Sequence, residues 1–295
     1  MRKHLFLLLA AASIAACAAI TPDLPAITES PTGSHDDGRV VWHDLLTTTP
    51  EASREFYGTL FGWTFERPGI DLGFGGDATY MLIRHEGELI GGMLDARELE
   101  AEGNVSQWIT MISTSNVDAA VERARSRGAE IVTEPVELAS RGRLAVLRDP
   151  DGALFALITA RGGDPAAREP VIDGFLWNEL WTDDVDAASA FYVDVAGLTR
   201  DDREIPGAGR DFRLLANANG PQSGIVANPF EGEKPVWINY LRVADPAAIT
   251  ARVESLGGRV IVDAQPRDIG GFVALVAGPS GAGIALQTWP LEETE

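Results

Sequence analysis

The stretch Val40–Leu45 (Val-Val-Trp-His-Asp-Leu), followed by Phe56-Tyr57 and Gly62-Trp63, occurs twice in this chain of 295 residues. Its second copy is Phe175–Leu180 (Phe-Leu-Trp-Asn-Glu-Leu), followed by Phe191-Tyr192 and Gly197-Leu198. Trp42 and Trp177 are 135 residues apart (177 − 42), and Tyr57 and Tyr192 give the same offset (192 − 57). Each copy predicts a hydrophobic strand, a helix and a glycine turn, so the repeat indicates a duplicated supersecondary unit.

The duplication continues further along the chain at a second offset. Gln107-Trp108-Ile109 matches Val236-Trp237-Ile238, and Asp149–Gly152 matches Gly278–Gly281, both at 129 residues. The change from 135 to 129 predicts a deletion of six residues in a loop of the second copy, where deletions are tolerated best. We therefore expect two domains of a common size, residues 38–160 and 171–290. A linker rich in Gly, Pro and Ala at 161–170 joins them, and an acidic tail follows at 291–295.

Four helices are expected from apolar periodicity and from capping residues, at 51–61, 117–127, 185–196 and 246–256. Thr49, Asn116 and Asp184 are predicted N-caps, and Gly62 is a predicted stop. Short strands fill the remaining segments, so each domain reads as βαβββ followed by a second βαβββ. The fold class is α+β.

The N-terminus predicts export and lipidation. Arg2 and Lys3 precede an apolar run, Leu5–Ala16, which is too short for a membrane span and is typical of a signal peptide. Ile14–Cys17 resembles the bacterial lipobox, so residues 1–17 are expected to be a lipoprotein signal with Cys17 as the lipidated residue. An ordinary signal peptide with an incidental cysteine is the alternative. Cys17 is the only cysteine, which excludes a disulfide within one chain.

Residue 18 is Ala where an inner-membrane lipoprotein would have Asp, so the expected location is the cell envelope, at the outer membrane facing the periplasm. Residues 18–37 have no periodicity and are expected to form a flexible tether. Contact with the membrane is expected through the lipid anchor only.

The charge of the chain excludes one class of partner. There are 44 acidic residues against 24 Lys and Arg, a net charge of −20. A surface this acidic repels phosphate backbones, so no nucleic-acid partner is expected. A small molecule remains the expected partner, and a homodimer is open.

The order of these motifs resembles the vicinal oxygen chelate superfamily, which includes glyoxalase I, extradiol dioxygenases and bleomycin-resistance proteins. The similar features are Trp-x-Asp/Glu-Leu, the helix with Phe-Tyr, the glycine after it and the Asp-Pro-Asp-Gly turn, over residues 38–160 and 171–290. The resemblance implies two tandem glyoxalase-like domains. In each, a pair of βαβββ modules forms an open, curled β-sheet cup around a small-molecule cavity.

The resemblance also implies three strand positions at which related enzymes hold a divalent metal with His and Glu. This chain has Trp, Ile and Ala there, at Trp42, Ile109 and Ala156 and at Trp177, Ile238 and Ala285. None of these side chains offers a lone pair to such an ion, so no metal or other cofactor is expected. His43 is a weak candidate ligand, because strand alternation points it away from the face that carries Trp42 and Asp44.

The side chains expected on the cup faces form an aromatic wall with one acid per domain: Trp42, Asp44, Leu46 and Met111 in the first, and Trp177, Glu179, Trp181, Tyr240 and Arg242 in the second, with Arg242 beside Glu179. Such a wall suits a small apolar or cationic ligand, and it is equally compatible with tryptophans that simply fill a core. The sequence identifies no catalytic residue.

Three hypotheses follow for the function. The first is an exported, lipid-anchored protein that binds a small molecule without metal. The second is a metal-dependent lyase or dioxygenase that uses a non-standard set such as His43, Asp44 and Glu179. The third is an envelope interaction protein whose cups are filled.

Overall fold

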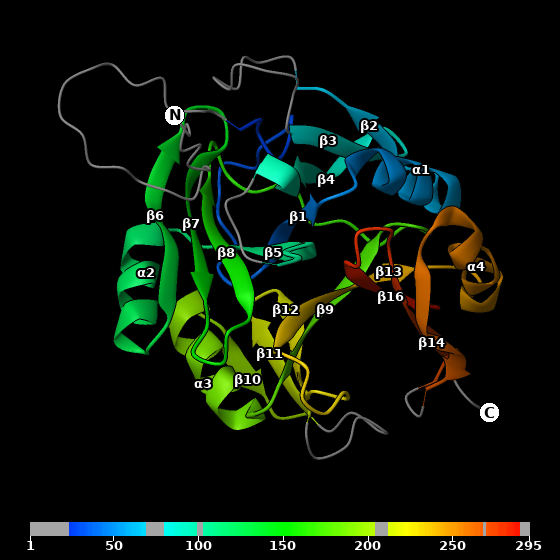
Figure 1. The fold of residues 1–295 in the computed structure, drawn as a ribbon. Coiled ribbons are helices and arrows are strands. Elements are labelled where there is room, and N and C mark those ends of the chain that lie inside the picture. Colours follow the sequence, from blue (N-terminus) through cyan, green and yellow to red (C-terminus); the bar gives the residue numbers. More distant parts are fainter. Residues whose placement is uncertain (1–23, 69–79, 99–102, 204–211, 268–269, 290–295) are drawn as a thin grey trace.

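The computed structural model describes residues 24–68, 80–98, 103–203, 212–267 and 270–289, and it contains two eight-stranded sheets (Figure 1). The first domain contains β1 (Val40–Thr47), α1 (Pro50–Phe61), β2 (Thr64–Glu66), β3 (Tyr80–His85), β4 (Glu88–Asp95), η1 (Ala96–Glu98), β5 (Gln107–Ser113), α2 (Val117–Ser126), β6 (Glu130–Leu138), β7 (Gly142–Arg148) and β8 (Leu154–Ala160). The second contains β9 (Phe175–Thr182), α3 (Val185–Ala196), β10 (Thr199–Asp201), β11 (Phe212–Asn217), β12 (Gly220–Ala227), β13 (Val236–Arg242), α4 (Pro246–Val253), η2 (Glu254–Leu256), β14 (Arg259–Pro266), β15 (Phe272–Ala277) and β16 (Gly283–Gln287).

The strand order is the same in both sheets. It is β2-β3-β4-β1-β5-β8-β7-β6 in the first domain and β10-β11-β12-β9-β13-β16-β15-β14 in the second. The two modules of a domain meet where β1 lies antiparallel to β5, and where β9 lies antiparallel to β13. Each open, curled sheet is therefore built from consecutive modules of one domain, as the tandem glyoxalase-like α+β fold requires.

Three of the four helices begin at a capping side chain. Asn116 accepts a hydrogen bond from the backbone N–H of Ala119, Asp184 from that of Ala187, and Asp245 from those of Ala247 and Ala248. Thr49 makes no such bond, which corrects its expected role as an N-cap. Pro50 begins that helix instead, since its fixed φ suits the first turn and it has no N–H to satisfy.

The two domains pack through the faces of their sheets that carry the helices. Helix α1 lies beside α4, and α2 lies beside α3 (Figure 1). One shared core joins Ile112, Ala124 and Phe155 of the first domain to residues of the second such as Phe191 and Trp237. The repeated Phe-Tyr and Trp motifs belong to these shared cores: Trp108 Nε1 donates to Tyr57 Oη over 3.2 Å, and Trp237 Nε1 donates to Tyr192 Oη over 3.0 Å. The opposite faces of the sheets carry a separate apolar cluster in each domain, which leaves one cup per domain.

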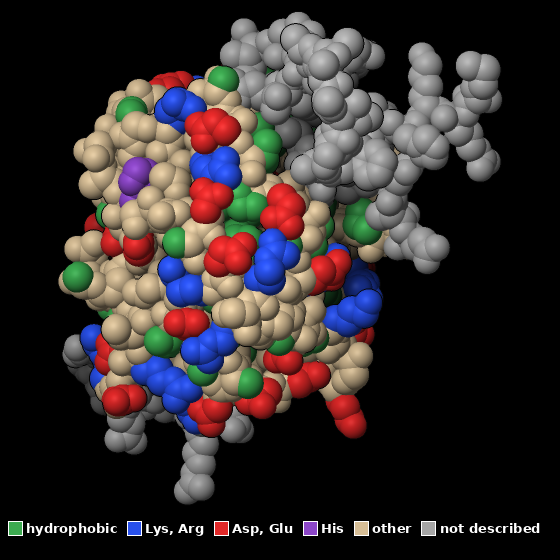
Figure 2. Space-filling model, turned by 90° about the vertical axis from the view of Figure 1, so that its left-hand side faces the viewer, with side chains coloured by type: hydrophobic (Ala, Val, Ile, Leu, Met, Phe, Trp, Pro, Cys, Tyr) green, Lys and Arg blue, Asp and Glu red, His purple; other side chains and the backbone are tan. Residues whose placement is uncertain are grey.

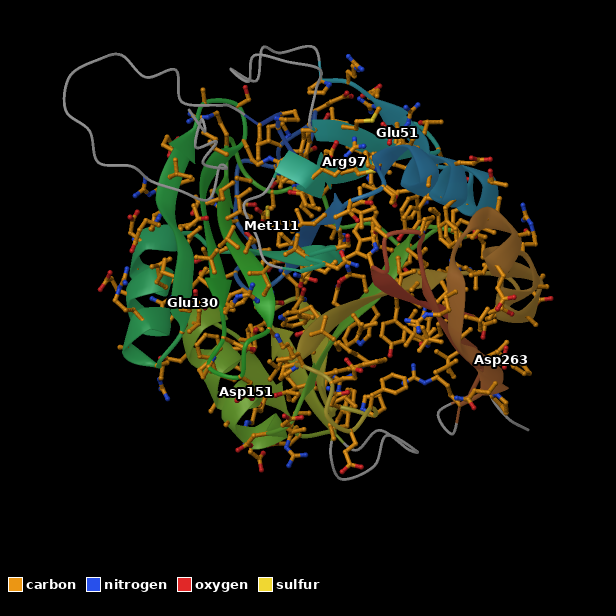
Figure 3. All side chains as sticks on the ribbon, in the orientation of Figure 1. Glu51, Arg97, Met111, Glu130, Asp151 and Asp263 are labelled. Carbon is orange, nitrogen blue, oxygen red and sulfur yellow. The ribbon has the colours of Figure 1, made fainter. Side chains whose placement is uncertain are left out.

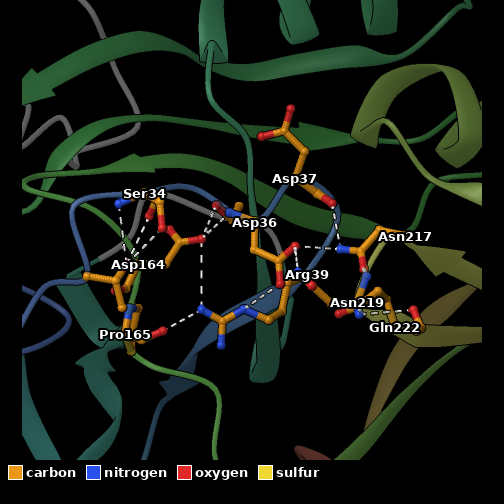
Figure 4. Close-up of polar contacts among 12 residues, drawn as sticks. Ser34, Asp36, Asp37, Arg39, Asp164, Pro165, Asn217, Asn219 and Gln222 are labelled. Atoms are coloured by element: carbon orange, nitrogen blue, oxygen red, sulfur yellow. Dashed lines mark hydrogen bonds and ion pairs between the residues drawn. The ribbon is translucent and has the colours of Figure 1, made fainter.

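Residues 24–37 differ from the expected flexible tether. Leu24 and Ile27 are buried in the apolar cluster of the first cup. The backbone N–H of Asp36 donates to Asp164, which also accepts from Ser113. Asp164 belongs to the expected linker and is itself buried. Figure 4 shows that this network continues through Asp36 to the amides of Asn217 and Asn219 in the second domain. Apolar burial and these hydrogen bonds fix the segment on both domains.

Acidic and basic side chains are interspersed on the face of the molecule shown in Figure 2. Most salt bridges are on the surface, for example Arg143 with Asp118 at 2.6 Å. Among the described residues no helix is both long and apolar enough to span a membrane.

Candidate functional site

The first cup is organised around the carboxylate of Asp44 on β1. Trp42 Nε1 donates to Asp44 Oδ1 over 2.8 Å, and the hydroxyl of Tyr80 donates to the same oxygen over 2.7 Å. Arg141 Nη1 donates to Asp44 Oδ2 over 3.0 Å, and its Nη2 donates to the Tyr80 hydroxyl over 2.6 Å. Every oxygen of the acid is thus satisfied, and its charge is balanced by a cation.

Arg141 is fully buried, with an exposed fraction of 0%. Its guanidinium lies over the rings of Trp42 and Tyr80, with centroid distances of 5.4 and 5.1 Å, within cation–π range. Its remaining Nε donates to the backbone carbonyl of Pro25 over 2.9 Å. Burial raises the pKa of Tyr80, so its phenol stays neutral and remains a donor to Asp44.

A glycine in the middle of β4 makes this arrangement possible. Gly92 lies opposite Asp44 in the sheet, and a Cβ there would lie 1.8 Å from the Tyr80 hydroxyl oxygen and 2.4 Å from Asp44 Oδ1. Any larger residue would push Tyr80 away from the acid. A glycine inside a strand marks such close approaches, so Gly91-Gly92 was a usable sequence signal for this site.

A cavity of about 60 Å³ lies beside Asp44 and Tyr80. Its other lining residues are apolar: Leu24, Leu46, Leu94, Ile109, Met111, Leu138, Leu144, Val146 and Ala156. Figure 3 shows Met111 on β5 in the interior, whereas Glu130 and Asp263 lie on the outer strands. The predicted cup residues Trp42, Asp44, Leu46 and Met111 are all on this face. The volume is enough for a few water molecules and much smaller than a site for a drug-sized ligand.

The second cup has an acid at the equivalent position, Glu179 on β9 (179 − 44 = 135). The hydroxyl of Tyr240 donates to Glu179 Oε2 over 2.5 Å. Arg267 Nη2 lies 3.8 Å from Glu179 Oε1, and its guanidinium lies 5.8 Å from the centroid of the Tyr240 ring. Burial raises the pKa of Tyr240, which keeps this phenol neutral as well.

The basic residue beside Glu179 is Arg267, which corrects the expectation for Arg242. Arg242 Nη1 donates to the backbone carbonyl of Pro170 in the linker over 2.5 Å. The register shift at this point places its extra residue, Leu176, in β9, while β13 pairs regularly with β16 through Arg242, the last residue of β13. Alternation along β13 predicts the face of Arg242 but not the partner of its long side chain, which at the end of the strand reaches the linker.

The apolar wall of the second cup is more open than that of the first. Trp181, Ile238 and Tyr240 are buried there. Several neighbours on the same face are only partly buried: Leu176, Trp177, Val226, Phe230, Val236, Val262 and Val273. The rings of Trp181 and Phe230 lie 5.8 Å apart. The predicted Trp177, Glu179, Trp181 and Tyr240 thus share this cup.

His43 belongs to the interface between the domains and not to a cup. Its Nε2 lies 2.9 Å from Asn178 Oδ1, and its ring stacks on Phe175 at 3.7 Å. His43 and Asn178 are equivalent positions of the repeat (178 − 43 = 135), so the two copies of β1 meet here. Burial lowers the pKa of His43 to about 4, and the imidazole is therefore neutral at pH 7.

The donors present do not fit the metal that the resemblance implies. Trp42, Ile109 and Ala156 occupy the ligand positions of the first cup, and no three His, Cys, Asp or Glu side chains of the described residues come together as a metal site. The alternative set of His43, Asp44 and Glu179 is not assembled either. Its two acids lie in different cups, and the histidine contacts Asn178.

Comparisons with known proteins agree with this architecture. The family model described as Glyoxalase/Bleomycin resistance protein/Dioxygenase superfamily matches residues 39–157 and 174–286. The relative CFP32 of Mycobacterium tuberculosis carries the name glyoxylase. It is 32% identical over 243 residues, which cover 82% of this chain and 91% of CFP32. The anthracycline biosynthesis protein DnrV of Streptomyces peucetius is 29% identical over 265 residues, covering 84% of this chain and 92% of DnrV.

Solved structures show the same fold at low sequence identity. The Mn(II)-bound glyoxalase from Novosphingobium aromaticivorans has a TM-score of 0.59 at 17% identity, covering 88% of this chain and 85% of that one. The 2,3-dioxygenase LapB from Pseudomonas sp. KL28 has a TM-score of 0.55 at 12% identity, covering 88% and 96%. Together with the two family-model matches and the duplicated cups, these likenesses show that the chain belongs to the glyoxalase/bleomycin resistance protein/dioxygenase superfamily, with two domains of that family in tandem.

Proposed function

We propose that this protein binds a small organic molecule in its β-cups without a metal ion. The observation that carries the proposal is the acid at the heart of each cup, which is held by a tyrosine hydroxyl and an arginine. In this scheme the arginine supplies the positive charge that a metal ion would otherwise bring to the carboxylate. The Trp, Ile and Ala side chains at the inherited ligand positions favour the same conclusion.

The second cup is the better candidate for an organic ligand of appreciable size. Its acid has a single hydrogen-bond donor among the described side chains, Tyr240, and Glu179 Oε1 lies 3.8 Å from Arg267, beyond hydrogen-bond distance. The partly exposed Trp177 and Phe230 provide flat apolar surface next to it. A ligand with a flat apolar body and one hydroxyl or amino donor directed at Glu179 matches these groups.

The names of the relatives point to small molecules in the same way. CFP32 is named for glyoxylase chemistry and DnrV for anthracycline biosynthesis. Both names concern small organic compounds, and neither defines the ligand of this chain.

A thermal-shift screen of small aromatic hydroxyl and amino compounds, followed by calorimetry on the hits, tests this proposal. We expect Glu179→Gln to weaken the binding of a hit by about tenfold, because a charge-assisted hydrogen bond becomes a neutral one. Glu122→Gln, an exposed substitution on α2 of the first domain, is the matched control and should leave the affinity unchanged. A hit whose affinity is the same in both variants would place the ligand elsewhere.

We also propose that the protein is exported and anchored through Cys17 to the outer membrane, facing the periplasm. The apolar run before a lipobox-like Ile14–Cys17 supports this location. Because Leu24 lies in the first cup, the seven peptide units between Cys17 and Leu24 (24 − 17) could hold the domains at most about 25 Å from the anchor. Metabolic labelling with a radioactive fatty acid should label the wild-type chain and not Cys17→Ser.

A further inference from the structure

The first cup is occupied by a segment of the chain's own N-terminus. Leu24, Pro25 and Ile27 are all buried, and Leu24 and Ile27 belong to the apolar cluster of the cup. Leu24 is also one of the residues that line the cavity beside Asp44. We call residues 24–27 the plug.

One polar contact defines the chemistry by which the cup holds the plug. Arg141 Nε donates to the carbonyl of Pro25, while Asp44 and Tyr80 fix the two terminal nitrogens of the same guanidinium. The cup therefore presents one rigid donor next to an apolar cavity. It recognises a carbonyl oxygen that lies close to a branched apolar group, here that of Leu24.

The plug is followed by a stretch with few attachments. Glu29, Ser30 and Pro31 are exposed, and the chain is fixed again where the backbone N–H of Thr32 donates to Asp164. Glu29 forms an ion pair with Arg84 at an exposed site, where such pairs contribute little. Release of the plug would therefore not require the network around Asp36 and Asp164 to break.

The second cup has no equivalent of the plug among the described residues. At the offset of 135, residues 24–27 correspond to Thr159–Gly162. These residues complete β8 and begin the linker, where the backbone N–H of Arg161 donates to the carbonyl of Arg141. In the first cup, which holds the plug, most of the apolar cluster is buried, whereas in the second cup most of the apolar side chains are only partly buried.

We propose that the first cup is a binding site for a small molecule with a carbonyl oxygen beside a branched apolar group, and that the plug is a resident occupant which this ligand displaces. The inference rests on the proposed function, namely that the cups bind small molecules. Displacement makes the apparent affinity equal to the intrinsic affinity multiplied by the fraction of molecules with the plug released. Loosening the plug therefore strengthens binding without adding a contact to the ligand.

The test uses the full chain labelled with ¹³C at its methionine methyl groups and titrated with 4-methyl-2-pentanone, a probe that combines an isobutyl group with a carbonyl. Met111 lines the cavity, whereas Met93 is buried in the core on the other face of the sheet, so Met93 is an internal control in each spectrum. We expect a saturable shift of Met111 alone. Ile27→Ala, which loosens the plug without changing a residue that lines the cavity, should raise the apparent affinity by about tenfold.

Leu24→Ala removes the group that the probe replaces, and it should raise the affinity at least as much. Leu176→Ala, a deletion of the same size in the second cup, should leave the Met111 titration unchanged. The hydrocarbon 2,4-dimethylpentane, which has the branched shape and no carbonyl, should bind more weakly than the ketone to every variant.

Equal affinities in the wild type, Ile27→Ala and Leu24→Ala would overturn the displacement proposal, and so would the absence of a Met111 shift in all three. In either case the proposed function still stands if the aromatic screen finds a ligand that depends on Glu179. Failure of both experiments would refute the proposed function as well.

Discussion

The two cups share an acid, a tyrosine and an arginine, but they assemble these groups differently. In the first cup the phenol comes from Tyr80 on β3, whereas in the second it comes from Tyr240 on β13. The position equivalent to Tyr240 in the first domain is Met111 (240 − 111 = 129). Phe212 is the position equivalent to Tyr80. Each of these two residues pairs, across the sheet, with the residue that lies two positions after the glycine opposite the acid of its cup.

The arginines differ as well, although both come from the hairpin before the third strand of the second module. Arg141 is fully buried and makes three hydrogen bonds within the first cup. Arg267 keeps 23% of its side chain exposed, lies 3.8 Å from its acid and donates to Gln287 over 2.5 Å. The difference shows that a buried carboxylate and its neutralisation are retained in both copies, while the side chains that provide the neutralisation are not fixed by the fold.

The largest effect is expected from removing the buried cation. Arg141→Met leaves Asp44 buried with phenol and indole donors and without a positive charge, which should lower the free energy of unfolding by about 3–5 kcal/mol. Arg267→Met should cost less than about 1 kcal/mol, since its pair is long and partly exposed. Urea unfolding at pH 7 measures both. Similar losses in the two variants would show that the cups are alike in energetics despite their different geometry.

The interface between the domains should show its own pH dependence through His43. Its pKa is about 4 in the folded protein and 6.5 as a reference, so between these values the unfolded chain binds the proton and the native state does not. Stability is therefore complete above pH 6.5 and falls as the pH is lowered towards 4, by about 3 kcal/mol in total. His43→Gln keeps a donor for Asn178 and cannot titrate. The stability of this variant should therefore fall less steeply between pH 6.5 and pH 4 than that of the wild type. Identical pH slopes in the wild type and the variant would contradict the assignment of the pH dependence to His43.

The exchange of tyrosine positions can be tested by moving the phenol. Tyr240→Phe removes the hydrogen-bond donor of Glu179 and should destabilise the protein by about 1–2 kcal/mol. Adding Phe212→Tyr brings a hydroxyl to the position that Tyr80 has in the first cup, because the Phe212 ring and Glu179 both flank Gly224. We expect the double variant to recover about half of the lost stability, which is measured from the midpoint of urea unfolding. No recovery would show that the two positions are not interchangeable.

The sequence predicts the fold well because the duplication constrains it at many places at once. The two offsets align every helix, and alternation places Trp42, Asp44, Trp177 and Glu179 on the cup faces, as found in the structure. Strand periodicity also predicts that His43 points away from the cup, and in the structure it contacts Asn178 and Phe175 of the second domain.

The partners of the acids were not predictable in the same way. Arg141 lies in a turn, where no periodicity reports direction, and Arg242 lies at the end of β13, where its long side chain reaches the carbonyl of Pro170. The sequence predicts a tether over residues 18–37, which include the plug, because four residues are too few to show a pattern. The sequence contains one indirect signal for the role of Tyr80, which is the glycine at position 92. Only glycine fits there, because the Tyr80 phenol and the Asp44 carboxylate approach each other at this position.

Metal analysis of the chain from Ala18, purified without chelator, tests the central claim most directly. The protein is then titrated with Zn(II), Ni(II), Mn(II) and Fe(II) by calorimetry. If arginine and tyrosine take the place of the metal in both cups, the purified protein should contain only traces of metal, and added ions should wash off on gel filtration. One tightly held divalent ion per chain, lost in Asp44→Asn or Glu179→Gln, would contradict it.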